Sequence, residues 1–253
     1  MTPALRILLG RTSTQMCLCF AAWLIAPLAH SQGACSSDDQ PAPTTLFERF
    51  INADCDACWR DPSTPAAPPK AVVLDWIVPS NQGEDAALAA AASSDALARL
   101  ASLQQTRPTT QSQHSQAVAN WPGLTLRVAH GPAVNNYVGM SVALTLPANT
   151  TLAWPLSGWV LLVENLPSGT EDSPLPRNLV RNALQPLWNK GQALSNQESI
   201  SLDDFRAMSL PEGTRPNRMQ LLGWVQDAQG QVMVAAGSLC PKEETSEPGG
   251  QTR

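Results

Sequence analysis

Long apolar segments and clusters of basic residues are both missing from this sequence of 253 residues. A membrane-spanning helix needs about 20 predominantly apolar residues, and no segment after residue 30 approaches that length. Lysine and arginine number 16 against 21 aspartate and glutamate residues, and they form no cluster. Because an acidic surface repels phosphate backbones, we exclude nucleic acid as a partner. We also expect no transmembrane segment in the mature chain.

Residues 1–31 have the three parts of a signal peptide. Arg6 and Arg11 give a basic start, and residues 16–29 form a fourteen-residue apolar run that is short for a membrane span. Small residues then stand at the −3 and −1 positions of a cleavage site before Gln32. Removal of this segment takes away two arginines and leaves fourteen basic against twenty-one acidic residues, a formal charge of −7. We expect a periplasmic or secreted protein.

Four cysteines follow this segment: Cys35, Cys55, Cys58 and Cys240. An even number of cysteines in an exported protein favours disulfides over free thiols. Cys55 and Cys58 can pair only with each other without straining two long loops, which leaves Cys35 to bond Cys240 and tie the two ends of the chain together. The alternative for Cys35 is acylation in a lipoprotein, because small residues precede it, although no aliphatic residue lies three positions before it.

Histidine is scarce, which limits metal and hydrolase chemistry. Only His114 and His130 follow residue 31. Together with Cys55 and Cys58 they would make a formal zinc site, but an oxidising compartment closes the cysteine pair instead. No G-x-S-x-G motif supports a Ser/His/Asp hydrolase. We therefore expect no metal and no cofactor.

The first half of the mature chain has both strand and helix patterns. Residues 32–45 are polar and contain proline, as linkers do. Residues 46–51 predict a short strand, and residues 71–78 predict a buried strand of the kind found in parallel sheets. Residues 83–104 predict an alanine-rich helix, and residues 107–115 predict a loop.

The second half has mainly strand patterns, with one short helix predicted at 179–188. Turn-forming residues separate six strand-like runs, at 124–129, 138–146, 159–164, 199–205, 219–226 and 231–239. This pattern is typical of an antiparallel β-sandwich. The predicted fold class is α+β, with an α/β domain at 46–130, a β-sandwich domain at 131–241 and a solvated tail at 242–253.

Three stretches of the chain follow one another in a characteristic order. They are residues 46–58 (LFERFINADCDAC), Trp121-Pro122 with 126–131 (LRVAHG), and 177–181 (RNLVR) with 221–227 (LLGWVQD) and 230–237 (GQVMVAAG). In this order they resemble a family of exported, thioredoxin-like bacterial proteins of unknown function, allied to a group of outer-membrane antigens. The resemblance implies that the predicted α/β domain is a reduced thioredoxin-like domain.

The resemblance also implies roles for three residues. Cys55 is then the attacking and Cys58 the resolving sulfur of thiol–disulfide exchange with an envelope protein, and Pro122 is a cis-proline packed beside them. Two features depart from redox-active thioredoxin-like proteins. Four prolines in residues 61–69 limit a helix after the pair to about one turn, and acidic residues flank Cys55, which disfavours a thiolate. A non-catalytic envelope module with a structural Cys55–Cys58 disulfide is therefore the second hypothesis.

We predict that the mature protein begins at or near Gln32. The intact mass of protein recovered from the periplasm measures this directly. A mass that still includes residues 1–31 would contradict the prediction, and an added lipid mass on Cys35 would support the lipoprotein alternative.

Overall fold

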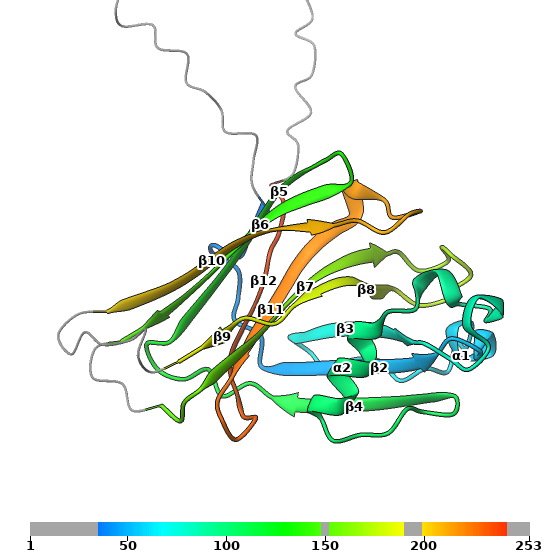
Figure 1. The fold of residues 1–253 in the computed structure, drawn as a ribbon, viewed down its shortest axis with the longest axis horizontal. Helices are drawn as coiled ribbons and strands as arrows, with labels where there is room; N and C mark the ends of the chain where they lie inside the picture. Colours follow the sequence, from blue (N-terminus) through cyan, green and yellow to red (C-terminus); the bar gives the residue numbers. More distant parts are fainter. Residues whose placement is uncertain (1–34, 148–151, 190–198, 242–253) are drawn as a thin grey trace, which may run out of the picture. The chain divides into compact units, whose positions relative to one another are not determined.

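The computed structural model describes residues 35–147, 152–189 and 199–241, which form mainly β-strands (Figure 1). The strands are β1 (Cys35–Ser36), β2 (Thr45–Asn52), β3 (Ala71–Val78), β4 (Gln111–Ala117), β5 (Thr125–Val134), β6 (Tyr137–Leu146), β7 (Leu156–Leu166), β8 (Arg177–Leu184), β9 (Leu187–Trp188), β10 (Ile200–Ser209), β11 (Met219–Gln226) and β12 (Val232–Gly237). The helical elements in these ranges are α1 (Asp56–Trp59), α2 (Ser94–Ser102) and the short 3-10 turns η1 (Gly83–Asp85), η2 (Ala89–Ala91) and η4 (Pro216–Arg218). The predicted signal peptide and the predicted tail at 242–253 lie outside the described residues.

The described strands form two sheets (Figure 1). The smaller sheet has four antiparallel strands in the order β1-β5-β6-β10. The larger sheet has eight, in the order β12-β11-β7-β8-β3-β2-β4, with β9 beside β7. In this larger sheet, β3 pairs in parallel with both β2 and β8. The other strand pairs of the sheet are antiparallel. The two sheets share an apolar core to which β5, β6, β7 and β11 all contribute.

The predicted α+β fold class is wrong, because the described residues form no thioredoxin-like α/β domain and no separate β-sandwich. Strands from both predicted domains, β2 and β3 from the first and β7, β8, β11 and β12 from the second, belong to one sheet. The predicted boundary between residues 130 and 131 falls inside β5. Residues 32–45, predicted as a linker, contain β1.

The segment that joins the two halves is β8, where the sequence predicted a helix. As a strand, this segment makes polar contacts with β3 and β7. The Asn178 backbone N–H donates to Asp75 Oδ2 at 2.9 Å, and Asn178 Nδ2 donates to the Val73 carbonyl at 2.9 Å. Arg181 Nη2 lies 2.6 Å from Glu164 Oε2 on β7. These tertiary contacts outweigh the weak helix propensity of the segment.

Two further differences concern the first half of the chain. The helix predicted at 83–104 is confined to α2, which begins where the Ser93 side chain accepts a hydrogen bond from the Asp95 backbone N–H at 3.1 Å. Residues 107–115, predicted as a loop, lead into and include part of β4, which lies at the edge of the larger sheet beside β2. Its sequence QSQHSQA is almost wholly polar, so it carries no hydrophobic strand pattern. No helix in the described ranges is long and apolar enough to cross a membrane.

A buried ion pair fixes α2 to the larger sheet. Arg99 Nη2 lies 2.7 Å from Glu48 Oε2, and both side chains are fully buried. Glu48 Oε1 also accepts a hydrogen bond from Trp76 Nε1 at 3.1 Å. The Arg99 guanidinium lies over the rings of Trp159 and Trp224, at 5.3 and 4.9 Å from their centroids. The ion pair, the hydrogen bonds and the two aromatic rings together compensate for the loss of hydration of the buried Arg99 guanidinium.

We predict that Arg99→Met lowers the free energy of unfolding by about 3–5 kcal/mol, because it leaves the Glu48 carboxylate buried without its partner. Urea unfolding followed by circular dichroism measures the change. Arg206→Met is the matched control, since Arg206 pairs with Asp204 at the surface and its loss should cost less than about 1 kcal/mol. Equal, small losses in both variants would contradict the role given to Arg99.

Candidate functional site

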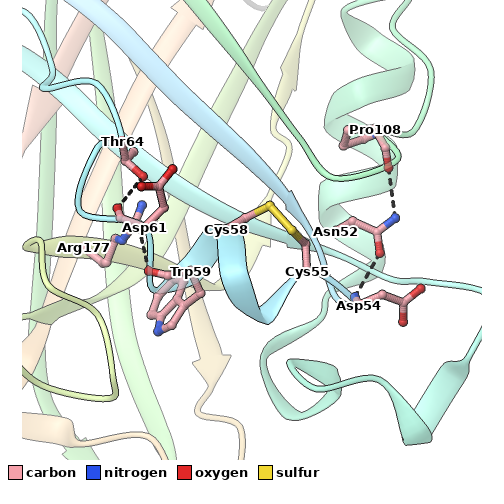
Figure 2. Close-up of a disulfide and its surroundings, with 9 residues drawn as sticks. All are labelled: Asn52, Asp54, Cys55, Cys58, Trp59, Asp61, Thr64, Pro108 and Arg177. Atoms are coloured by element: carbon pink, nitrogen blue, oxygen red, sulfur yellow. Dashed lines mark hydrogen bonds between the residues drawn. A yellow bond between two sulfur atoms is a disulfide. The ribbon is translucent and has the colours of Figure 1, made fainter.

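The cysteine pair lies at the carboxyl end of β2, beside the end of its parallel neighbour β3 (Figure 2). Asn52, the last residue of β2, stabilises the turn that contains the cysteine pair. Its Nδ2 donates to the Pro108 carbonyl at 2.9 Å, and its Oδ1 accepts from the Asp54 backbone N–H at 3.0 Å. The Cys55 N–H donates to the Asn52 carbonyl at 2.8 Å. The turn is therefore held by the strand and by the loop before β4.

Cys55 and Cys58 form a disulfide across α1, with their Cα atoms 5.2 Å apart. Cys55 is half-buried, whereas Cys58 is 8% exposed. Cys58 belongs to an apolar cluster that also includes Ile51, Ile77 and Leu179. Cys55 is therefore the more accessible sulfur. Because α1 has only four residues, it offers little helix dipole to stabilise a thiolate there.

Trp59 is the best-anchored side chain next to the disulfide. Its indole Nε1 donates to the Glu171 carbonyl at 2.7 Å, and its own carbonyl accepts from Arg177 Nη2 at 2.9 Å. The Arg177 guanidinium also stacks on the ring, 4.9 Å from its centroid, and pairs with Asp75 Oδ1 at 3.1 Å. In Figure 2 the sulfur–sulfur bond lies between Trp59 and the turn at Asn52 and Asp54.

The basic side chains in this region bind other groups or lie elsewhere. Arg107, beside Pro108, donates to Asn81 Oδ1 at 3.0 Å. Arg60, five residues after Cys55, pairs with Asp56 and with Asp172, both at 3.2 Å. Lys70 precedes β3 and so lies at the opposite end of the parallel pair. His114 is opposite the middle of β2. In the described part of the chain, neither histidine nor lysine stands at the carboxyl end of β2.

The structure does not bring Pro122 to the cysteines. Ala117, at the end of β4, pairs with Thr45, the first residue of β2, so Pro122 follows at the opposite end of that strand from Cys55. A strand of eight residues spans about 26 Å at roughly 3.3 Å per residue. The cis peptide bond in the described ranges is Trp154–Pro155. Pro122 instead lines a pocket with Trp121 and residues of β12.

A small apolar pocket that the sequence did not reveal lies beside Trp59. Its volume is about 260 Å³. Apolar side chains from β3, β7, β8 and the alanine-rich segment before α2 line it, together with the polar residues Glu171, Arg181 and Glu212. The alanine-rich pattern at 83–104 was the available signal, but it was interpreted as a helix. The cavity is large enough for one or two side chains and too small for a dinucleotide cofactor.

The second disulfide joins Cys35 to Cys240, as expected, with Cα atoms 4.0 Å apart. Beside it, backbone hydrogen bonds link Ser36 and Leu239, at 3.1 and 2.8 Å. The bond thus connects the first strand of the smaller sheet to the segment after β12. A sulfur held in a disulfide carries no acyl group, so the structure disfavours the lipoprotein alternative for Cys35.

His130 stands next to this second disulfide rather than to the first. It is 6% exposed and lies directly opposite Cys35 in the β1–β5 register. Burial lowers its pKa below the usual value, and the contact of Nδ1 with the Gly131 carbonyl at 3.0 Å offsets this only in part. The four-residue zinc grouping considered from the sequence is therefore not assembled, because His114 and His130 lie in different sheets.

The comparisons with known proteins add no assignment. No family model matches the chain, and no significant match was found among curated proteins or solved structures.

We predict that the two disulfides differ in their effect on stability. Replacing Cys35 and Cys240 by serine opens a loop with a sequence separation of 205 and should lower the free energy of unfolding by up to about 5 kcal/mol. Replacing Cys55 and Cys58 opens a loop of separation 3 and should cost only about 2 kcal/mol. Urea unfolding of the two double variants compares them. A larger loss from the Cys55/Cys58 variant would contradict the loop-entropy account.

Proposed function

We propose that this protein is a non-catalytic binding module of the cell envelope, in which the Cys55–Cys58 disulfide is structural. Cys55–Cys58 closes the turn that begins α1, and Arg177 and the Glu171 carbonyl hold Trp59 at the wall of the apolar pocket. The partner would place an apolar side chain in that pocket, next to the charged groups of Glu171, Arg181 and Glu212.

The observation that carries this proposal is the environment of the cysteine pair. Cys58 is buried in an apolar cluster, and the nearby guanidiniums of Arg60 and Arg177 are already paired with carboxylates. A thiolate formed on reduction would lie in a turn with Asp54 and Asp56 and beside a helix of only four residues, so the reduced pair gains little charge stabilisation. Trp59, by contrast, is held by hydrogen bonds on both its indole and its carbonyl. The arrangement supports a fixed surface more than a reactive centre.

Export to an oxidising compartment belongs to the same proposal. All four cysteines in the described ranges are paired in disulfides, and such bonds persist in periplasmic and secreted proteins. The signal-peptide pattern of residues 1–31 and the acidic mature chain are consistent with this location and with a partner other than nucleic acid.

Thiol–disulfide exchange is the second candidate, and one observation favours it. Cys55 is the more exposed sulfur of the pair, and Cys58 lies buried behind it. This is the order that exchange requires, since an outer thiol attacks and an inner thiol resolves the mixed disulfide. The apolar pocket beside Trp59 would then contact the substrate protein.

The reduction potential of the Cys55–Cys58 bond separates the two candidates. We expect a value below about −300 mV, the range of structural disulfides. The measurement is made in a Cys35→Ser/Cys240→Ser variant equilibrated with dithiol redox buffers, with thiols counted by alkylation and mass spectrometry. The quadruple serine variant is the blank. A potential between about −120 and −270 mV would overturn the structural role and favour exchange.

A further inference from the structure

Three potential metal ligands meet at the second disulfide. The Sγ atoms of Cys35 and Cys240 and a ring nitrogen of His130 all lie within 4.8 Å of one another. They come from β1, from the segment after β12 and from β5. The register that places Cys35 opposite His130 brings these two side chains to one face of the smaller sheet.

His130 has an unused ring nitrogen inside the fold. Its Nδ1 lies 3.0 Å from the Gly131 carbonyl, to which a protonated Nδ1 donates. In that tautomer Nε2 carries the free lone pair, and Nε2 is buried without a hydrogen-bond partner among the described residues. A buried acceptor left unpaired costs free energy. Histidines that bind metals commonly show this arrangement, because a hydrogen bond from one nitrogen to a backbone carbonyl orients the other toward the metal.

We propose that Cys35, Cys240 and His130 form a Zn²⁺ site when their disulfide is reduced. A dithiol reductant donates two electrons and two protons, its own sulfurs form a disulfide, and the Cys35–Cys240 bond opens to two thiols. Zn²⁺ then displaces the two thiol protons and binds both thiolates and Nε2 of His130. Two cysteines and one histidine are a known donor set for zinc with an open fourth position.

The surroundings leave room for that fourth ligand. Cys35, His130 and Cys240 line one cavity of about 810 Å³, together with residues of the β5 bulge and of η4. Water or a donor group from a bound molecule would complete a tetrahedral site there. Because thiolates are soft ligands, the site selects zinc over magnesium or calcium. The metal would then replace the covalent link between β1 and the end of the chain, so the two ends stay joined in both redox states.

The test uses the full mature chain with Cys55→Ser and Cys58→Ser, so that no other thiol binds metal. The protein is reduced with a phosphine, which competes little for zinc. The disulfide oxidises the phosphine to its oxide, and water supplies the oxide's oxygen and the two thiol protons. Cobalt(II) is then titrated, because thiolate ligands give it charge-transfer absorption, and zinc is added to displace it. We expect one equivalent of metal with thiolate absorption in the reduced protein, and none in the oxidised protein.

Two variants identify the ligands. His130→Ala should weaken zinc binding by at least roughly 100-fold, since removing even an outer-shell partner costs 10–100-fold. His114→Ala removes the other histidine of the described residues and should leave the affinity unchanged. If His130→Ala does not fold by circular dichroism, His130→Gln, which keeps a polar side chain of similar size, replaces it with the same expected loss.

Several outcomes would overturn the site. They are absence of stoichiometric binding in the reduced protein, equal binding in the oxidised protein, and unchanged affinity in a folded His130 variant. If reduction unfolds the chain, zinc should restore the native circular dichroism, and failure to do so counts against the site. Because Cys55 and Cys58 are absent throughout, none of these results bears on the function proposed above.

Discussion

The carboxylate of Asp75 is the point on which the larger sheet depends. It is fully buried on β3, and it faces two guanidiniums, Arg49 and Arg177, whose Nη1 atoms lie 3.0 and 3.1 Å from Oδ1. Its other oxygen accepts the backbone N–H of Asn178 at 2.9 Å. This is also where β3 and β8 pair in parallel, at Asp75 and Leu179. One side chain therefore joins the first half of the chain to the second.

The same carboxylate reaches the cysteine pair through Arg177. The guanidinium that pairs with Asp75 also donates to the Trp59 carbonyl and stacks on the Trp59 ring. An uncompensated charge at this depth would be strongly unfavourable, so the buried Arg177 guanidinium depends on the Asp75 carboxylate. The position of Trp59, and with it the wall of the apolar pocket, thus depends on an ion pair in the middle of the sheet. The disulfide closes a turn that the contacts between Arg177 and Trp59 already hold in place.

The sequence predicted the strands that have a strong local pattern. The prediction was wrong for segments whose structure depends on contacts with residues distant in sequence. Residues 71–78 and 219–226 are rich in apolar and β-branched or aromatic residues, and both are strands with those bounds. The segment at 177–184 alternates polar and apolar residues too weakly to exclude a helix. Its pairing with β7 and its contacts with Asp75 and Glu164 make it a strand. The pairing of four cysteines followed from their spacing. The position of Pro122 did not, because it depended on a fold that the chain does not adopt.

The distance in sequence between Cys35 and Cys240 imposes an order on folding. The chain is synthesised from its N-terminus, so of the four cysteines that form the two disulfides Cys35 is made first. Its native partner, Cys240, follows 205 residues later. During that interval Cys55 and Cys58 are the other thiols of the described chain that Cys35 meets. Cys55 and Cys58 are bonded to each other in the folded protein, and once that bond has formed neither competes for Cys35. A Cys55–Cys58 bond formed before Cys240 is available would therefore leave Cys35 free for its native partner.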